Sequence, residues 1–377
     1  MKKRIIASVL TTMLIVTALS GCGGNDQEFE KKNDKMMKPT AAEIMQNVNT
    51  DDITQFSGSM NFDVTGGIGF SDIDPDSQMF MDTIADELGF ELAEGLDLSA
   101  GIDLDFVGEK NDLASHVKMD GNMNVSTNSA ELNASITEST DSNTSIFGEF
   151  YTDFQEKVEY EYDQDTDTWY ASEYVEKDMS KVKDVDFEHV FELLDTAGDV
   201  SEVVFENDTY SFDVALTISN DMTEDQKNAV RELAKIGAEA GLVEADEKYK
   251  DLELDPDAGE PEEEKDIFET LMQVSEYGTL EMPVSVKFDF KKVGDKYNID
   301  SMDIAAGLAF GAIFDAEKVG EFTGKVVGMA VKFVADVDLG CDIVADFDFG
   351  YDPVDVSIPA EIIGNAVDSM SEVIVAD

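Results

Sequence analysis

Alternation of apolar and polar residues at every second position dominates the chain and predicts β-strands. The clearest segments are 117–125, 132–136, 158–162, 210–218, 284–290, 297–299 and 333–351. Strands with one apolar and one polar face are typical of antiparallel sheets whose apolar side must be covered. The last segment would extend about 60 Å at a rise of about 3.3 Å per residue, so we expect a break or bend near Gly340.

Helical periodicity occupies shorter stretches between these strands. Thr40 and Glu43 have capping-box spacing and start the first predicted helix. Further helices are predicted near 77–92 and 184–196, after Thr223 and after Pro261, with an exposed acidic loop over 246–266. These helices are the expected covers of the sheet, so the predicted class is α+β. Strand–helix–strand alternation with Gly-rich turns is lacking, which argues against a two-lobed solute-binding protein.

The amino terminus reads as an export signal. A basic start is followed by an apolar run over 5–19 and by Leu19-Ser20-Gly21-Cys22. This is the lipobox pattern of a bacterial lipoprotein, in which residues 1–21 are removed and Cys22 carries the lipid, such as palmitate. We therefore expect a tether over 22–38, one domain over 39–377, and a position outside the cytoplasm on the outer face of the cell membrane. An ordinary secreted protein with an accidental cysteine is the alternative.

The charge of the chain restricts the classes of molecule that it can bind. Asp and Glu number 84 against 26 Lys and Arg, giving a formal net charge of −58. Such a chain repels phosphate backbones, so nucleic acid is excluded and membrane contact is left to the lipid. Cys341 has no partner once Cys22 is acylated, so the fold must rest on its apolar core.

Catalytic and metal-binding patterns are weak. His116 and His189 are the two histidines, and neither has a partner at metal-ligand spacing. The acidic triplets that start at Asp72 and Asp163 lack the glycine and glutamate of a calcium loop. We therefore expect no enzyme activity, no cofactor and no metal site, and we interpret Cys341 as a small residue on the apolar face.

The order of elements resembles a known family. Its marks are Trp169-Tyr170, a helix over 187–194, a hairpin over 203–218, and an ending in which an aromatic-Asp step leads to Ile358-Pro359. This order is similar to the LolA/LppX/LprG-like carrier lipoproteins and their uncharacterised Gram-positive relatives, over most of 39–361. The resemblance implies a strongly curved antiparallel half-barrel, closed by helices over an apolar cavity for acyl chains. This chain departs from the family in its helical and acidic insertions near 71–96 and 222–277 and in its negative charge, which suits a neutral or cationic cargo.

Five aromatic residues are the candidate lining of that cavity: Phe212, Phe288, Phe290, Phe347 and Phe349. The predicted function is therefore a membrane-anchored protein that binds or carries a lipid or other apolar ligand. The alternative is an acidic cell-surface scaffold or interaction lipoprotein with a filled core and no small-molecule ligand. A continuous apolar cavity between sheet and helices would separate these two readings.

Overall fold

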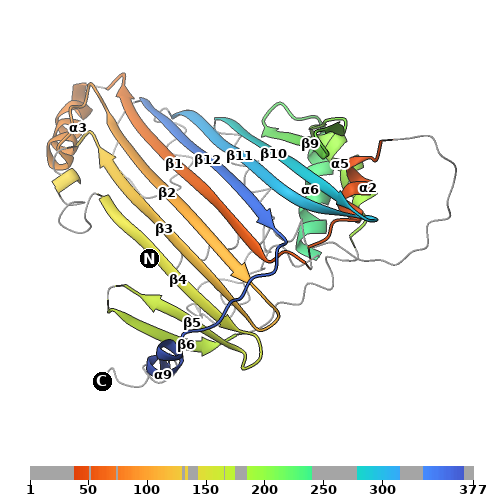
Figure 1. Ribbon diagram of the computed structural model, residues 1–377. Helices are drawn as coiled ribbons and strands as arrows, with labels where there is room; N and C mark the ends of the chain where they lie inside the picture. The colour runs from red at the N-terminus through yellow and green to blue at the C-terminus, as the bar shows by residue number, and fades with distance from the viewer. Residues whose placement is uncertain are drawn as a thin grey trace, which may run out of the picture.

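The fold is known from a computed structural model, which describes residues 38–50, 52–73, 75–129, 132–134, 143–164, 166–174, 185–239, 278–314 and 334–368. Within these residues the protein is mainly one large, open antiparallel sheet of 13 strands (Figure 1). Cys22, the tether over 22–38, the acidic loop over 246–266 and the helix expected after Pro261 lie outside the described residues.

The elements follow one another as a run of strands, a group of helices and a second run of strands. Their order is α2 (Ala41–Gln46), β1 (Gln55–Ser71), α3 (Pro75–Leu88), β2 (Leu96–Lys110), β3 (Ala114–Thr127), β4 (Asn143–Asp153), β5 (Val158–Asp163), β6 (Thr168–Glu173), α5 (Phe187–Ala197), β7 (Asp199–Val200), β8 (Val204–Glu206), β9 (Thr209–Ser219), α6 (Glu224–Glu239), β10 (Thr279–Val293), β11 (Lys296–Phe314), β12 (Val334–Gly350), α9 (Ala360–Asn365) and β13 (Val367–Asp368).

The strand order across the sheet is β13-β6-β5-β4-β3-β2-β1-β12-β11-β10-β9-β7, with β8 paired to β9. Strands β1 to β6 form one meander and β9 to β12 form another. The two meanders meet where β1 pairs with β12, from Gln55 opposite Gly350 to Ser71 opposite Val334. All pairings are antiparallel except that of β13 with β6.

Local sequence signals explain the turns and helix starts. Asn207 and Asp208 both have positive φ, 51° and 64°, in the two-residue turn between β8 and β9, which is the pattern of a type I′ hairpin. Gly294, with φ 67°, opens the turn between β10 and β11. In the capping box of α2, the Thr40 hydroxyl accepts from the Glu43 amide at 3.1 Å, and the Thr40 amide donates to Glu43 Oε2 at 2.8 Å. The hairpin expected over 203–218 and the predicted first helix are confirmed.

Two sequence predictions about strands are wrong. No break occurs at Gly340, because β12 runs from Val334 to Gly350 and keeps unbroken register with both β1 and β11. Pairing on both sides holds the long strand together, and Gly340 leaves space for Thr65 on the neighbouring strand. Residues 132–134 are helical rather than extended, since Ser129 Oγ accepts from the Leu132 amide at 3.1 Å and starts a helical turn.

We predict that Gly58 is required by close packing. A side-chain carbon at Gly58 on β1 would collide with the carbonyl oxygen of Asp346 and lie 2.9 Å from the Phe106 ring. Gly58→Ala should therefore lower the free energy of unfolding by about 1–3 kcal/mol, measured by urea unfolding followed by circular dichroism. The control is Gly237→Ala in α6, where a side chain would meet nothing within 4 Å. It should raise stability by up to about 1 kcal/mol; equal effects of the two substitutions would contradict the prediction.

Candidate functional site

The apolar face of the sheet is the candidate site. Its side chains lie opposite one another in cross-strand rows, as when Phe212 faces Phe288, Phe288 faces Met302 and Met302 faces Phe347. The row continues through Gly58 to Phe106 and Met119. We call this side the apolar face, and the opposite side, which carries the aspartates of β12, the polar face.

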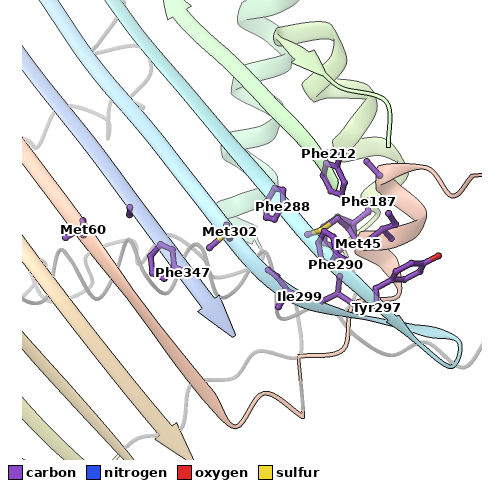
Figure 2. Packing of buried hydrophobic residues seen from close by; sticks show 14 of the residues in the cluster. Met45, Met60, Phe187, Phe212, Phe288, Phe290, Tyr297, Ile299, Met302 and Phe347 are labelled. Atoms are coloured by element: carbon purple, nitrogen blue, oxygen red, sulfur yellow. The ribbon is translucent and has the colours of Figure 1, made fainter. Parts of the chain in front are cut away.

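One end of the apolar face is tightly packed. Phe290 and Ile299 have no exposed surface, and Phe212 is 5.3 Å from Phe288 and 5.7 Å from Phe290 between ring centroids. Helices α2 and α5 contribute Met45 and Phe187 to the same cluster, as Figure 2 shows. Burial of apolar side chains from α2, α5 and β9–β12 stabilises this packed end.

The five phenylalanines predicted to line a cavity all belong to this end of the protein. Phe212, Phe288, Phe290 and Phe347 are buried in the cluster, and Phe349 packs against it half-buried. The Phe347 ring lies 5.2 Å from that of Phe106. Two hollows that described residues line, of about 700 Å³ and about 290 Å³, are bordered by none of these five phenylalanines.

Farther along the strands the same face is partly open. Leu98 and Leu339 are each 46% exposed and Ile68 is 38% exposed, although all three have the parity of the buried residues. Phe310 faces Leu339 across the β11–β12 pairing and is half-buried. We call these four residues the uncovered stretch. Farther along the chain lies α3 (Figure 1). Just after this helix, the Phe90 ring stacks on the ring of Phe70 in β1, with 6.2 Å between the ring centroids.

Among the described helices, α2 and α5 pack on one end of the apolar face and α6 packs against β9, and the uncovered stretch lies beyond the packed end. This stretch was not predicted, because β1 and β2 were not identified as strands from the sequence. The signal was present, since Phe56, Gly58, Met60, Phe62 and Val64 alternate with polar residues in β1.

Cys341 is half-buried on the apolar face of β12, two residues after Leu339 of the uncovered stretch. Burial raises the pKa of its thiol, and the neighbouring carboxylate of Asp342 raises it further. A thiol with a raised pKa stays protonated at neutral pH and is a poor nucleophile. This agrees with the interpretation of Cys341 as an apolar residue, although it is less buried than predicted.

The two histidines have different surroundings. His116 Nε2 lies 2.9 Å from Glu149 Oε1, and its ring stacks on Tyr151 at 4.2 Å. His189 is exposed on α5, with Nδ1 3.8 Å from Glu192. In the described part of the chain, no group of three or more His, Cys, Asp or Glu side chains is placed to hold a metal ion. No helix there is long and apolar enough to cross a membrane.

An aromatic cluster on the polar face was also missed. Trp169 lies 5.3 Å from Tyr162 and 5.6 Å from Tyr151, between ring centroids. The alternation is inverted in β5, where Tyr160 and Tyr162 share the polar face while Glu159 lies on the apolar side. Burial raises the pKa of Glu159, and the carboxylate of Glu161 adds to the shift. We interpret the cluster as cross-strand packing that holds β4 to β6 together.

No protein-family model matches this chain, and no curated protein matches it.

We predict that the two parts of the apolar face differ sharply in their contribution to stability. Phe290→Ala at the packed end should lower the free energy of unfolding by about 3–5 kcal/mol, because it creates a buried cavity. Leu339→Ala in the uncovered stretch should cost less than about 1.5 kcal/mol, since nearly half of its side chain is already in water. Chemical unfolding of both variants measures the difference, and equal losses would mean that Leu339 is covered in solution.

Proposed function

We propose that the protein is a membrane-anchored extracytoplasmic lipoprotein that binds a lipid or another apolar ligand on the uncovered stretch. The observation that carries the proposal is the half-exposed row of Leu98, Leu339 and Ile68 in an otherwise buried apolar face. Contiguous exposed apolar surface on a soluble protein marks sites where something apolar binds. The proposal includes a sheet curved into a half-barrel with helices over this face.

The energetics are adequate for an acyl chain. Burial of about 500 Å² of lipid surface would provide roughly 12 kcal/mol before the costs of association. An acyl chain on the uncovered stretch would lie across β11, β12, β1 and β2, which carry its four residues. The formal charge of −58 favours a neutral or cationic headgroup over an anionic one.

A second candidate function is supported by the packed end. All five predicted phenylalanines pack in or against a filled core, as expected for a scaffold that presents its acidic surface to other proteins. Under that reading the uncovered stretch binds no small molecule. The two candidates therefore differ in a single measurement, the binding of an apolar probe.

We predict that Leu98→Gln/Leu339→Gln reduces binding of a neutral fluorescent monoacylglycerol at least tenfold, because two amides replace the apolar floor of the site. Stability should change little, since both side chains are partly exposed. Fluorescence titration of the purified mature domain gives the affinity, and mass spectrometry of co-purifying lipids identifies a natural ligand.

The matched control is Val107→Gln/Val344→Gln. Val107 and Val344 are 55% and 56% exposed on the same two strands, but they lie on the polar face. This control should bind the probe as the wild type does. Equal loss in both variants would indicate non-specific adsorption, and no binding by the wild type would favour the scaffold.

The lipid anchor has its own test. Cys22→Ala should abolish metabolic labelling with a radioactive fatty acid and release the protein from the membrane fraction, because the thiol is the acylation point of a lipobox. Cys341→Ala should leave labelling unchanged. Labelling that persists in Cys22→Ala would overturn the anchor.

A further inference from the structure

The hollow of about 290 Å³ lies at the end of the sheet where β1 begins and β2 ends (Figure 1). Its lining comes from the segment before β1, the turn between β2 and β3, the turn between β4 and β5, and Tyr174 after β6. No residue of the uncovered stretch takes part in it. The hollow is therefore separate from the proposed lipid site.

Hydrogen bonds tie the segments around the hollow together. The Lys110 amide donates to the Thr54 carbonyl at 2.8 Å, and the Tyr174 amide donates to the Lys157 carbonyl at 2.9 Å. The side chain of Asn111 accepts from two amides of its own turn, each at 2.9 Å. These bonds fix the walls before any ligand binds, which lowers the conformational cost of binding.

One wall of the hollow is apolar. The rings of Phe154 and Tyr174 meet edge to face with 5.8 Å between their centroids, and Ile53 lies half-buried in the same lining. Such a wall suits an aromatic group, because ring edges and faces attract one another. The volume is at the lower limit of ligand pockets, about 300 Å³. It therefore suits a ligand of the size of one amino acid better than an acyl chain.

The charged residues of the lining are not paired with one another. Lys110, Lys157 and Asp112 all border the hollow, and none takes part in an ion pair within the described part of the chain. Free lysines are unexpected here, because Asp and Glu number 84 against 26 Lys and Arg. Two ammonium groups and one carboxylate thus remain available to a ligand that carries both signs of charge.

The backbone of Lys157 is strained. Its φ of 56° lies in the left-handed region, which glycine adopts freely and which costs energy for a long side chain. The other described non-glycine residues with positive φ are all aspartate or asparagine, which tolerate this region: Asp72, Asp167, Asn207 and Asp208. Strain of this kind gathers at binding sites. We interpret Lys157 as a lysine kept for its ammonium group at a position that favours glycine.

We infer that this hollow binds a free α-amino acid with an aromatic side chain. The carboxylate of the ligand binds the ammonium groups of Lys110 and Lys157, and its own ammonium group binds Asp112. The aromatic side chain packs against Phe154 and Tyr174. This arrangement uses every charged group of the lining. The inference is independent of the lipid proposal, because the two sites share no residue.

The test is isothermal titration of the mature chain, residues 22–377, with three probes that share a phenyl group. These are phenylalanine, 3-phenylpropionate, which lacks the ammonium group, and phenethylamine, which lacks the carboxylate. Phenylalanine should bind at one saturable site, about tenfold more tightly than either other probe, since each of these loses a charge-assisted contact. No binding of phenylalanine, or equal affinity for phenylalanine and 3-phenylpropionate, would overturn the inference.

Lys157→Gly separates binding from stability. Glycine relieves the backbone strain, so the melting temperature should stay the same or rise, while the affinity for phenylalanine should fall about tenfold. The control is Lys296→Gln, which removes an exposed lysine at the start of β11, outside the hollow. It should bind phenylalanine within about twofold of the wild type. Equal weakening in both variants would mean diffuse attraction by surface charge and would overturn the site.

Asp112→Asn tests the contact with the ammonium group of the ligand. It should lower the affinity for phenylalanine to that for 3-phenylpropionate, because the amide cannot neutralise a positive charge. Binding of 3-phenylpropionate itself should stay the same or tighten, since a neighbouring negative charge is removed. Equal loss of both probes would mean that Asp112 only shapes the turn, and the assignment of a zwitterionic ligand would fail.

Discussion

The pairing of β1 with β12 is the constraint on which the sheet depends. It joins the meander of β1 to β6 to that of β9 to β12, and its partners are separated by most of the chain. Side chains alternate between the two faces of a strand, so a slip of one residue would move every side chain to the opposite face. The register of β1 and β12 therefore also decides which side chains are buried. Met60 meets Ala345 and Leu104 only in this register, and the core row from Phe212 to Met119 is continuous for the same reason. Such long-range pairing is slow to form, since loop closure precedes the contacts that stabilise it.

The same register separates two chemistries on one sheet. On the apolar face, burial increases from Leu339 toward Phe290, where α2 and α5 supply their own apolar residues. On the polar face, aspartates and glycines share cross-strand rows. A strand has two faces, so Leu339 belongs to the apolar face while its neighbours Asp338 and Gly340 belong to the polar face.

Local signals in the sequence were sufficient for much of this fold. Thr40 and Glu43 fixed the first helix, and Gly294 fixed the hairpin of β10 and β11, since caps and tight turns depend on neighbours in sequence. Strand order depends on partners far along the chain, and nothing local to Phe347 indicates Gly58 or Met302. The expected break at Gly340 failed for this reason, because two long neighbours hold β12 in register. The uncovered stretch was missed because β1 and β2 were not identified as strands, although β1 alternates from Phe56 to Val64. Trp169 was placed without the inversion of faces in β5.

Many carboxylates lie close together on the polar face, and the sheet must accommodate their mutual repulsion. Like charges directly opposite one another destabilise a sheet, and the register avoids most such pairs by placing small or neutral residues opposite the acids. Asp348 faces Ser57 and Ser301, the carboxylate of Asp346 accepts from Ser59, and Asn61 donates to Asp103 at 2.7 Å.

Asp289 shows the same principle under partial burial. Burial opposes its ionisation, but hydrogen bonds from Ser211, Lys287 and Ser301 lower its pKa overall. Where glycine rather than serine stands opposite the acid, as Gly67 and Gly311 do beside Asp338, repulsion is relieved without a donor. The carboxylate then keeps its acceptor capacity, and the missing side chains open a depression beside it. The residue choice that relieves repulsion in an acidic sheet thus also leaves depressions in its polar face.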